Sequence, residues 1–267
     1  MMEKKSSYSV VAILQARMSS SRLPGKVLRP IMGRPMLEYH LGRLSRSCKI
    51  DKLIVATSDQ KDDSPICDLC DNLGVDFYRG SLNDVLDRFY RASLEFPSDI
   101  IVRLTGDCPL ADPKIIDHGI KRFINSDFDY LSNTVERTFP IGLDFEIFYS
   151  HHLKKAGENA VLPSEREHVT PYFHNHPEIF SIGQFSNDID LSHHRWTVDE
   201  PQDFEFVLKV FESLYPDNPA FTTNDVLRLL ERRPELMSLN YDIIHGVGYE
   251  KSIREDIIFL EKNIIET

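Results

Sequence analysis

The stretch Gln15-Ala16-Arg17-Met18-Ser19-Ser20-Ser21-Arg22-Leu23-Pro24-Gly25-Lys26 carries the strongest structural signal in this chain. It follows Val10-Val11-Ala12-Ile13-Leu14, an apolar run that predicts a buried strand. The strand therefore leads into a loop with three cations, three serines and a Pro-Gly turn. Glycine lets a backbone approach a ligand closely, and arginine and lysine neutralise phosphate charge. A loop of this composition after a first strand predicts a phosphate-binding site.

Two common nucleotide-binding motifs do not match this loop. A Walker A motif needs a glycine five positions before the Gly25-Lys26 pair, where this chain has Ser20. The dinucleotide fingerprint needs three glycines, and the loop has one. The loop therefore indicates phosphate binding of another kind.

Composition limits the class of protein. The chain has 267 residues, 41% hydrophobic and 27% charged, with a net charge of −11. These values are typical of a globular α/β protein with an ample core. An acidic chain is a poor general binder of nucleic acid, so no nucleic-acid partner is expected.

The N-terminus and the cysteines indicate a cytoplasmic location. Residues 1–9 are polar and lack an apolar signal core, and no stretch approaches the roughly 18 apolar residues of a membrane span. We therefore expect no membrane association and reduced thiols. Cys67 and Cys70 form a CxxC pair without a second pair for zinc, and a structural role is favoured for them over metal or redox chemistry.

Strand and helix patterns alternate along the first half of the chain, which predicts a mostly parallel sheet with helices on both faces. The expected strands there are 10–14, 52–56, 75–78 and 100–104, and the expected helices are 35–47, 63–73, 82–96 and 113–125. In the second half we expect extended segments at 143–148, 179–185 and 195–199, and helices at 164–174, 201–214, 224–233 and 252–263. We assign residues 8–240 to one domain and 241–267 to a C-terminal helical extension of it.

Two aspartates are candidate metal ligands. Asp107 follows the buried strand 100–104, at the sheet edge where ligands of parallel sheets bind. A carboxylate beside a phosphate site is repelled unless a cation such as Mg²⁺ bridges the two. Asp199, at the end of 195–199, is the candidate second ligand. The alternative is that these acids cap helices, which we favour for Asp203.

Other polar residues are candidates for binding an acceptor. Asp144 and Glu146 would share one strand face, which suits a cation or sugar hydroxyls between them, although a solvated edge is equally compatible. Arg166 and His168 open a helix and could contact an anionic acceptor. The paired histidines elsewhere are more typical of a protein surface than of zinc sites.

Taken together, these motifs resemble the cytidylyltransferases of the acylneuraminate and 3-deoxy-manno-octulosonate type, and in particular the branch of the spore coat polysaccharide biosynthesis protein F. The matching segments occur in family order between about residues 10 and 210. Besides the first loop they are Asp84-Val85-Leu86-Asp87-Arg88, Arg103-Leu104-Thr105-Gly106-Asp107-Cys108-Pro109-Leu110, Gly142-Leu143-Asp144-Phe145-Glu146, Arg166-Glu167-His168-Val169-Thr170-Pro171 and Thr197-Val198-Asp199-Glu200-Pro201-Gln202-Asp203.

The resemblance implies a Rossmann-like, GT-A-like α/β fold, a three-layer sandwich with a mostly parallel central sheet. It implies an enzyme that transfers CMP from CTP to a sugar, releases pyrophosphate and uses Mg²⁺, in surface polysaccharide or glycoconjugate biosynthesis. Relatives of this type commonly form dimers, so a homodimer is one expectation.

The resemblance also assigns residues. Arg17, Lys26 and Asp107 become catalytic, Asp107 and Asp199 hold the metal, and Arg195 joins the candidates for binding the acceptor's carboxylate. The nucleotide-binding set is Ala16, Arg17, Ser21, Arg22, Gly25, Lys26, Arg88, Arg103 and Asp107.

Three other functions remain compatible with the residues. A glycosyltransferase would use a nucleotide-sugar on a similar sheet and release no pyrophosphate. A sugar-1-phosphate nucleotidyltransferase usually has more glycine in its first loop. A non-catalytic nucleotide-binding subunit would bind CTP without turnover. The sequence names neither the acceptor nor the nucleotide base.

Overall fold

The computed structural model describes residues 8–243 and 246–265. Its strands are β1 (Val10–Gln15), β2 (Pro30–Ile31), β3 (Arg34–Pro35), β4 (Lys52–Ser58), β5 (Asp76–Gly80), β6 (Ile100–Thr105), β7 (Tyr130–Ser132), β8 (Glu146–Tyr149) and β9 (Ile182–Gln184). Its α-helices are α1 (Met36–Leu44), α2 (Ser64–Leu73), α3 (Val85–Glu95), α4 (Pro113–Ile124), α5 (Ser150–Asn159), α6 (Pro163–His168), α7 (Pro171–Asn175), α8 (Pro201–Leu214), α9 (Thr223–Arg232) and α10 (Val247–Ile265). The described residues also form the short 3-10 helices η1 (Lys26–Leu28), η2 (Lys61–Asp63) and η3 (Pro234–Leu239).

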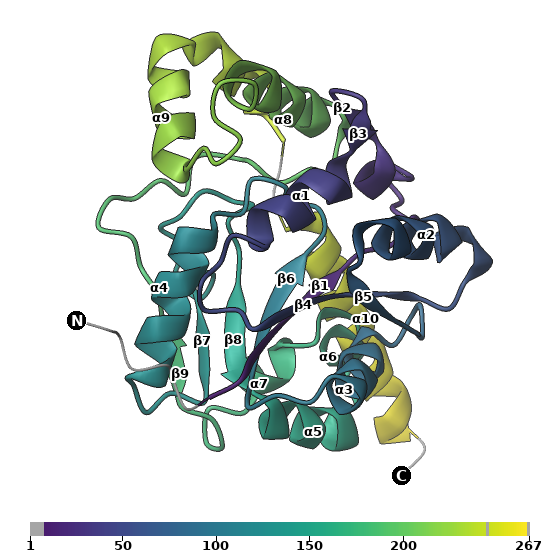
Figure 1. Cartoon of the computed structure of the whole chain (residues 1–267). Helices are drawn as coiled ribbons and strands as arrows, with labels where there is room; N and C mark the ends of the chain where they lie inside the picture. Colours follow the sequence, from purple (N-terminus) through teal and green to yellow (C-terminus); the bar gives the residue numbers. More distant parts are fainter. Residues whose placement is uncertain (1–7, 244–245, 266–267) are drawn as a thin grey trace.

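A seven-stranded sheet runs through the centre of the molecule in the order β5-β4-β1-β6-β8-β7-β9 (Figure 1). β1 pairs in parallel with both β4 and β6, while β8 is antiparallel to its two neighbours. The predicted mostly parallel α/β sheet is confirmed. Its parallel half brings the carboxyl ends of β1, β4 and β6 to one edge, where ligands of such sheets bind.

Helices cover both faces of the sheet and complete a three-layer sandwich. Alternate residues of β1 point to opposite faces: Val10, Ala12 and Leu14 pack with α1, α2 and α4, while Val11 and Ile13 pack with α3, α5 and α7. This double burial explains why the β1 sequence is apolar without interruption.

A third apolar cluster lies beyond the carboxyl edge of the sheet. Trp196 and Val198 pack there against α8 and α9, and Tyr39 of α1 joins them. Figure 1 shows α8 and α9 above the sheet, on the side of α1. This packing anchors the segment that carries Asp199 next to the strand ends.

The segment 195–199 is not the strand that we expected. Its only bridge among the described residues joins Arg195 to Ile141. The backbone N–H of Trp196 donates to Ile141 O at 2.6 Å, and that of Val198 donates to Asp107 O at 2.8 Å. The segment is extended, but its hydrogen bonds go to two different loops, so no ladder forms.

Two other expected elements differ in ways that move candidate site residues. The strand expected at 143–148 begins only at Glu146, because the Asn133 side chain binds Leu143 O and the N–H of Phe145 in place of a ladder partner. Asp144 therefore lies before the strand and does not share a strand face with Glu146. The helix expected at 164–174 divides into α6 and α7 at Val169 (φ 72°), just before Pro171 restricts the chain. Elsewhere, α5 and β7 were not expected, and β9 is shorter than the extended segment expected at 179–185.

α10 packs against α6 and includes the helix expected at 252–263. It buries Ser252 and Asp256, and exposes Ile253, Ile257 and Leu260.

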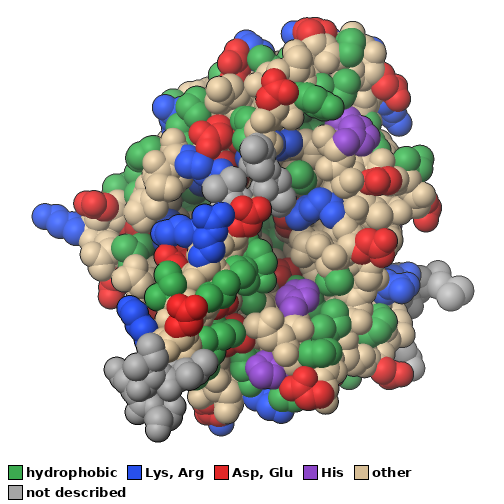
Figure 2. All heavy atoms as spheres, turned by 180° about the vertical axis from the view of Figure 1, so that it is seen from behind, with side chains coloured by type: hydrophobic (Ala, Val, Ile, Leu, Met, Phe, Trp, Pro, Cys, Tyr) green, Lys and Arg blue, Asp and Glu red, His purple; other side chains and the backbone are tan. Residues whose placement is uncertain are grey.

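The face seen in Figure 2 carries hydrophobic side chains beside a central hollow with acidic and basic side chains around it. Among the described residues, no helix has the length and apolar character needed to cross a membrane. The division into 8–240 and 241–267 stays a prediction, and 244–245 and 266–267 lie outside the described residues.

Gly142 allows the loop before β8 to approach the 195–199 segment. Its φ is 104°, and a Cβ there would lie 2.4 Å from the backbone N of Thr197.

We expect Gly142→Ala to lower the free energy of unfolding by about 2–5 kcal/mol, from backbone strain and overpacking together. Chemical denaturation measures it. Gly33→Ala is the control, since its φ is 84° and no atom lies within 4 Å; only about 1–2 kcal/mol of conformational strain is expected. Equal losses would contradict the close approach.

Candidate active site

The loop after β1 folds back on itself and directs Lys26 inward. The N–H of Gly25 donates to Met18 O at 2.9 Å, and the N–H of Met18 donates to Asp63 Oδ1 at 2.7 Å. Gly25 has a φ of 70°, a left-handed conformation that glycine adopts without steric cost. Lys26 follows at the start of η1 and is only 8% exposed.

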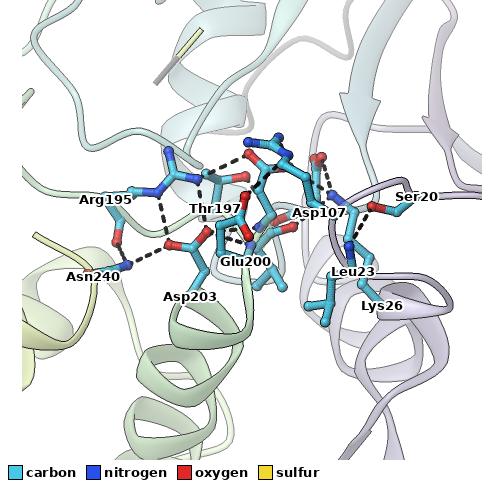
Figure 3. Close-up of polar contacts among 12 residues, drawn as sticks. Ser20, Leu23, Lys26, Asp107, Arg195, Thr197, Glu200, Asp203 and Asn240 are labelled. Carbon is cyan, nitrogen blue, oxygen red and sulfur yellow. Dashed lines mark hydrogen bonds and ion pairs between the residues drawn. The ribbon is translucent and has the colours of Figure 1, made fainter. Parts of the chain in front are cut away.

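The ammonium group of Lys26 joins two distant aspartates, Asp107 and Asp199. Figure 3 shows Lys26 and Asp107 side by side. Lys26 Nζ lies 3.0 Å from Asp107 Oδ2, 3.0 Å from Asp199 Oδ1 and 2.7 Å from Val198 O. Arg22 also contacts Asp199, with Nη2 2.9 Å from Oδ1. The structure thus brings the cationic loop and the two predicted metal carboxylates to one point.

Backbone contacts hold the three segments together. The N–H of Gly106 donates to Gln15 O at 2.8 Å, which ties the Asp107 loop to the end of β1.

Burial alone would raise the pKa of the Asp107 carboxyl, but the Lys26 ammonium holds it below its ordinary value. Burial likewise opposes the charge of Lys26, while Asp107 and Asp199 raise the pKa of its ammonium above the ordinary value.

The donor set fits a divalent cation that also binds the substrate. Mg²⁺ in proteins is usually held by one or two carboxylates together with substrate phosphates and water. Asp107 and Asp199 supply two carboxylates whose oxygen atoms lie within 3.0 Å of a common position, that of Lys26 Nζ. No group of three or more His, Cys, Asp and Glu side chains suited to a metal occurs in residues 8–243 and 246–265. The remaining ligands of an ion at this point would come from phosphate and water.

A second group of charged residues surrounds Glu146 at the start of β8. Arg103 Nη1 pairs with Glu146, and Tyr130 donates its hydroxyl to the same carboxylate at 2.7 Å. Burial alone would raise the pKa of Glu146, but Arg103 foremost lowers it below the ordinary value. Glu146 thus already has a cation and hydroxyl partners within the protein.

Arg88 is a buried cation without matching acceptors. It is 1% exposed, and its Nε and Nη1 have no hydrogen-bond partner in the described part of the chain. Burial and the nearby charge of Arg17 lower the pKa of Arg88 to about 10. The desolvation cost of such a group is normally offset by a paired anion. The nearby charges of Asp63 and Asp59 offset part of it, but in the described part of the chain neither carboxylate accepts a hydrogen bond from Arg88 Nε or Nη1.

The remaining predicted residues occupy different surroundings. Ala16 is buried, Arg17 is half-buried and Ser21 is exposed. Asp144 pairs with Arg137 through both oxygens, at 2.5 and 3.0 Å. Because it precedes β8, it does not share a strand face with Glu146, and this expectation was wrong.

The residues expected to bind an acceptor are partly engaged. Arg166 pairs with Asp84, and His168 Nε2 lies 2.9 Å from Ser252 Oγ of α10. Burial lowers the pKa of His168 below its ordinary value. Arg195 Nε binds Asp203 and Nη2 binds Asp199, so these two nitrogens are already occupied by carboxylates of the protein. Binding of an acceptor by Arg195 stays a prediction.

Sequence reasoning missed several residues that build the site. Arg43 of α1 is 1% exposed and donates to Ala111 O, Leu110 O and Phe221 O, which fixes the chain just after Asp107. Arg43 lies three residues after His40 on the buried face of α1. An arginine on the apolar face of a helix could have indicated a buried cation with acceptors elsewhere in the chain. Asn240 gives no local signal, because its partners lie 45 and 37 residues away.

Residues 11–232 match a family model described as cytidylyltransferase. The chain belongs to the cytidylyltransferase family. It is therefore a CTP-dependent nucleotidyltransferase, as the resemblance implied.

Individual relatives cover most of this cytidylyltransferase. An uncharacterized protein of Methanocaldococcus jannaschii is 37% identical over 248 residues, which is 92% of this chain and 98% of its own. The spore coat polysaccharide biosynthesis protein SpsF of Bacillus subtilis is 32% identical, over 85% of this chain and 95% of its own. The solved structure of a cytidylyltransferase from Leptospira borgpetersenii has a TM-score of 0.83 at 34% identity, over 89% of this chain and 99% of that one.

Lys26→Met tests the ion pairs at the centre of the site. The variant leaves Asp107 and Asp199 facing each other without the ammonium, so we expect the free energy of unfolding at pH 7 to fall by about 1–3 kcal/mol. Urea denaturation at several pH values, with a chelator present, measures it.

The pH dependence gives the sign of the effect. The lowered pKa of Asp107 makes its contribution present above about pH 4 and lost in stronger acid, and the raised pKa of Lys26 makes its contribution present below about pH 10 and lost above it. Without the ammonium the pKa of Asp107 rises, so acid relieves the repulsion in the variant. The difference in free energy of unfolding between wild type and Lys26→Met should be largest at about pH 6–9 and should decrease towards pH 4. A difference that does not change with pH would contradict the ion-pair geometry.

Proposed function

We propose that this cytidylyltransferase transfers CMP from CTP to an acidic sugar, such as a 2-keto acid sugar, and releases pyrophosphate. The observation that carries the proposal is the convergence of Lys26 with Asp107 and Asp199 at the carboxyl edge of the parallel strands. A role in surface polysaccharide or glycoconjugate synthesis is supported by the name of the Bacillus subtilis relative.

The loop after β1 would hold the triphosphate. Arg17 and Lys26 would bind the phosphates that leave as pyrophosphate, with Arg22, Ser21 and Gly25 beside them. A Mg²⁺ held by Asp107 and Asp199 would supply neutralisation of phosphate charge. An acceptor oxygen would attack the α-phosphorus as the bond to pyrophosphate breaks, so most of the catalysis would come from positioning and from stabilisation of charge.

Several cations would serve the anionic groups of nucleotide and acceptor. Arg103 and Arg88 would lie towards the nucleotide, and Arg166 and His168 of α6 towards the acceptor's carboxylate. The unpartnered Nε and Nη1 of Arg88 support this placement, because a buried guanidinium without acceptors is suited to an incoming anion. Asp144 and Glu146 would contact acceptor hydroxyls only through oxygen lone pairs that Arg137 and Arg103 leave free.

A pyrophosphate-release screen tests the reaction. CTP, UTP, ATP and GTP are each combined with a panel of acidic and neutral sugars, with and without Mg²⁺. We expect release with CTP and an acidic sugar in the presence of Mg²⁺, and a loss of about 10²–10³ in rate for Asp107→Asn, comparable to removal of one transition-state contact. The control is Asp117→Asn, because the Asp117 carboxylate binds Ser47 and Cys48 and is not a candidate site residue. Asp144→Asn would be unsuitable as a control, since Asp144 is a candidate for contacting the acceptor. Turnover from a CDP-sugar without pyrophosphate release would contradict the proposal.

Arg88→Met separates ligand binding from structure. Because Arg88 is buried without acceptors for two of its nitrogens, the ligand-free variant should be as stable as wild type, or up to about 1 kcal/mol more stable. Its affinity for CTP, measured by calorimetry, should fall at least about tenfold, the equivalent of one charge-assisted contact of about 1.5–3 kcal/mol.

Arg43→Met is the matched control. Arg43 is equally buried, and burial likewise lowers its pKa to about 10, but it donates to three carbonyls and stacks on Phe221 at 4.1 Å. This variant should lose about 2–4 kcal/mol of stability, because it orphans buried carbonyl groups. The interpretation of Arg88 is wrong if Arg88→Met destabilises the ligand-free protein as much as Arg43→Met does.

A further inference from the structure

Asp203 does more than cap a helix. As expected from the sequence, it belongs to the capping box of α8 and accepts the N–H of Glu200 at 2.9 Å. It also accepts the N–H of Asp199 at 3.0 Å. Its side chain is 0% exposed and receives further donors from Arg195 and Asn240. Five hydrogen bonds to one buried carboxylate exceed what capping requires.

Arg195 connects Asp203 to Asp199. Its Nε and Nη2 each lie 2.9 Å from an oxygen of Asp203, in the bidentate geometry that fixes a guanidinium plane. The same Nη2 lies 3.2 Å from Asp199 Oδ2. Lys26 occupies the other oxygen, Oδ1. Arg195 therefore contacts the Asp199 carboxylate on the oxygen that Lys26 does not bind. Figure 3 shows Arg195 between Asn240, Asp203 and the rest of the site.

Asn240 closes the network from the C-terminal part of the chain. Its Nδ2 donates to Arg195 O and to Asp203 Oδ1, both at 2.9 Å, and the residue is 4% exposed. It lies after residue 232, where the match to the family model ends. The segment after α9 thus reaches the Asp203 and Arg195 pair through the buried amide of Asn240.

A second helix in the same molecule shows what capping alone looks like. Asp225 occupies the equivalent capping-box position of α9, accepting from the N–H and Oγ1 of Thr222, both at 2.8 Å. Its cation is Arg228, whose side chain is 68% exposed. Within residues 8–243 and 246–265, Asp225 makes no hydrogen bond or ion pair to Lys26, Asp107 or Asp199. The buried arginine and the asparagine are additions specific to Asp203.

We propose that Asp203, Arg195 and Asn240 are positioning residues that hold the Asp199 carboxylate in the orientation needed to bind a divalent cation. This inference rests on the proposed function, in which Asp199 is a metal ligand. A buried ion pair adds little net stability over an apolar pair, so its value at this place is the geometry that it imposes. Partners behind a metal ligand typically contribute 10- to 100-fold in metal affinity.

Binding of Mn²⁺ alone, followed by the electron paramagnetic resonance signal of the free ion, tests the proposal without turnover. Asp203→Asn should weaken Mn²⁺ binding about tenfold or more, and Asn240→Ala should weaken it in the same direction. Asp225→Asn, the matched capping variant, should bind Mn²⁺ as wild type does. Asn240→Ala keeps the Arg195 and Asp203 pair, so it provides the test if Asp203→Asn does not fold. Thermal unfolding of each variant reports its folded fraction.

Asp199→Asn separates the two levels of inference. If Asp199→Asn weakens Mn²⁺ binding while folded Asp203→Asn and Asn240→Ala bind it like wild type, the positioning role is overturned and the metal assignment stands. If Asp199→Asn itself binds Mn²⁺ like wild type, the metal assignment fails and the positioning proposal fails with it. Arg195→Lys gives a further check, since it keeps the charge but not the bidentate geometry, and should resemble Asp203→Asn.

Discussion

The ammonium group of Lys26 is the interaction on which both the fold and the site depend. It joins three chain segments, with partners 81 and 173 residues away in sequence, at the edge of the sheet where β1 and β6 end. Two carboxylates this close would repel each other strongly in a partly buried position. With the ammonium between them, the same charges hold the loops together. The proposed phosphate and cation site is thereby held together before either ligand binds.

The buried cations around this centre fall into two physical kinds. All three nitrogens of Arg43 donate to carbonyls, and two of the three nitrogens of Arg195 pair with carboxylates while its Nη1 has no partner in the described part of the chain. Their cost of burial is therefore largely offset within the chain, and they fix loops. Arg88 retains unpaired nitrogens and borders another cation, Arg17, which disfavours its charge. Sites that bind anions commonly hold cations in such unfavourable surroundings, because the ligand completes them. The two kinds differ in how many of their nitrogens the chain itself satisfies: three for Arg43 and two for Arg195, while Nε and Nη1 of Arg88 have no partner in the described residues.

The parts of this structure that were predictable from sequence are those with local causes. An apolar run buried on both faces indicates β1, a Pro-Gly turn indicates the loop that carries Lys26, and Pro201 with Asp203 marks the start of α8. The errors arise where a group outside the segment takes the place of a ladder partner. The Asn133 side chain, 10 and 12 residues before its partners, delays the start of β8. Backbone bonds to Ile141 and Asp107, more than 50 residues away in sequence, keep 195–199 out of the sheet. The pattern of apolar residues within each segment carries no sign of either partner.

The C-terminal part of the chain shows why a family pattern does not describe the whole site. The matched region ends at residue 232, yet Asn240 contacts the network behind Asp199, and Ser252 contacts His168 on α6. The two contacting residues, Asn240 and Ser252, are 12 residues apart in sequence, and both side chains are buried. Such contacts are sensitive to small changes, because an orphaned polar group costs more than its hydrogen bond contributes. The extension is thus coupled to both the proposed metal ligand and the proposed acceptor side, and substitutions in it can alter the site without touching the residues that define the family.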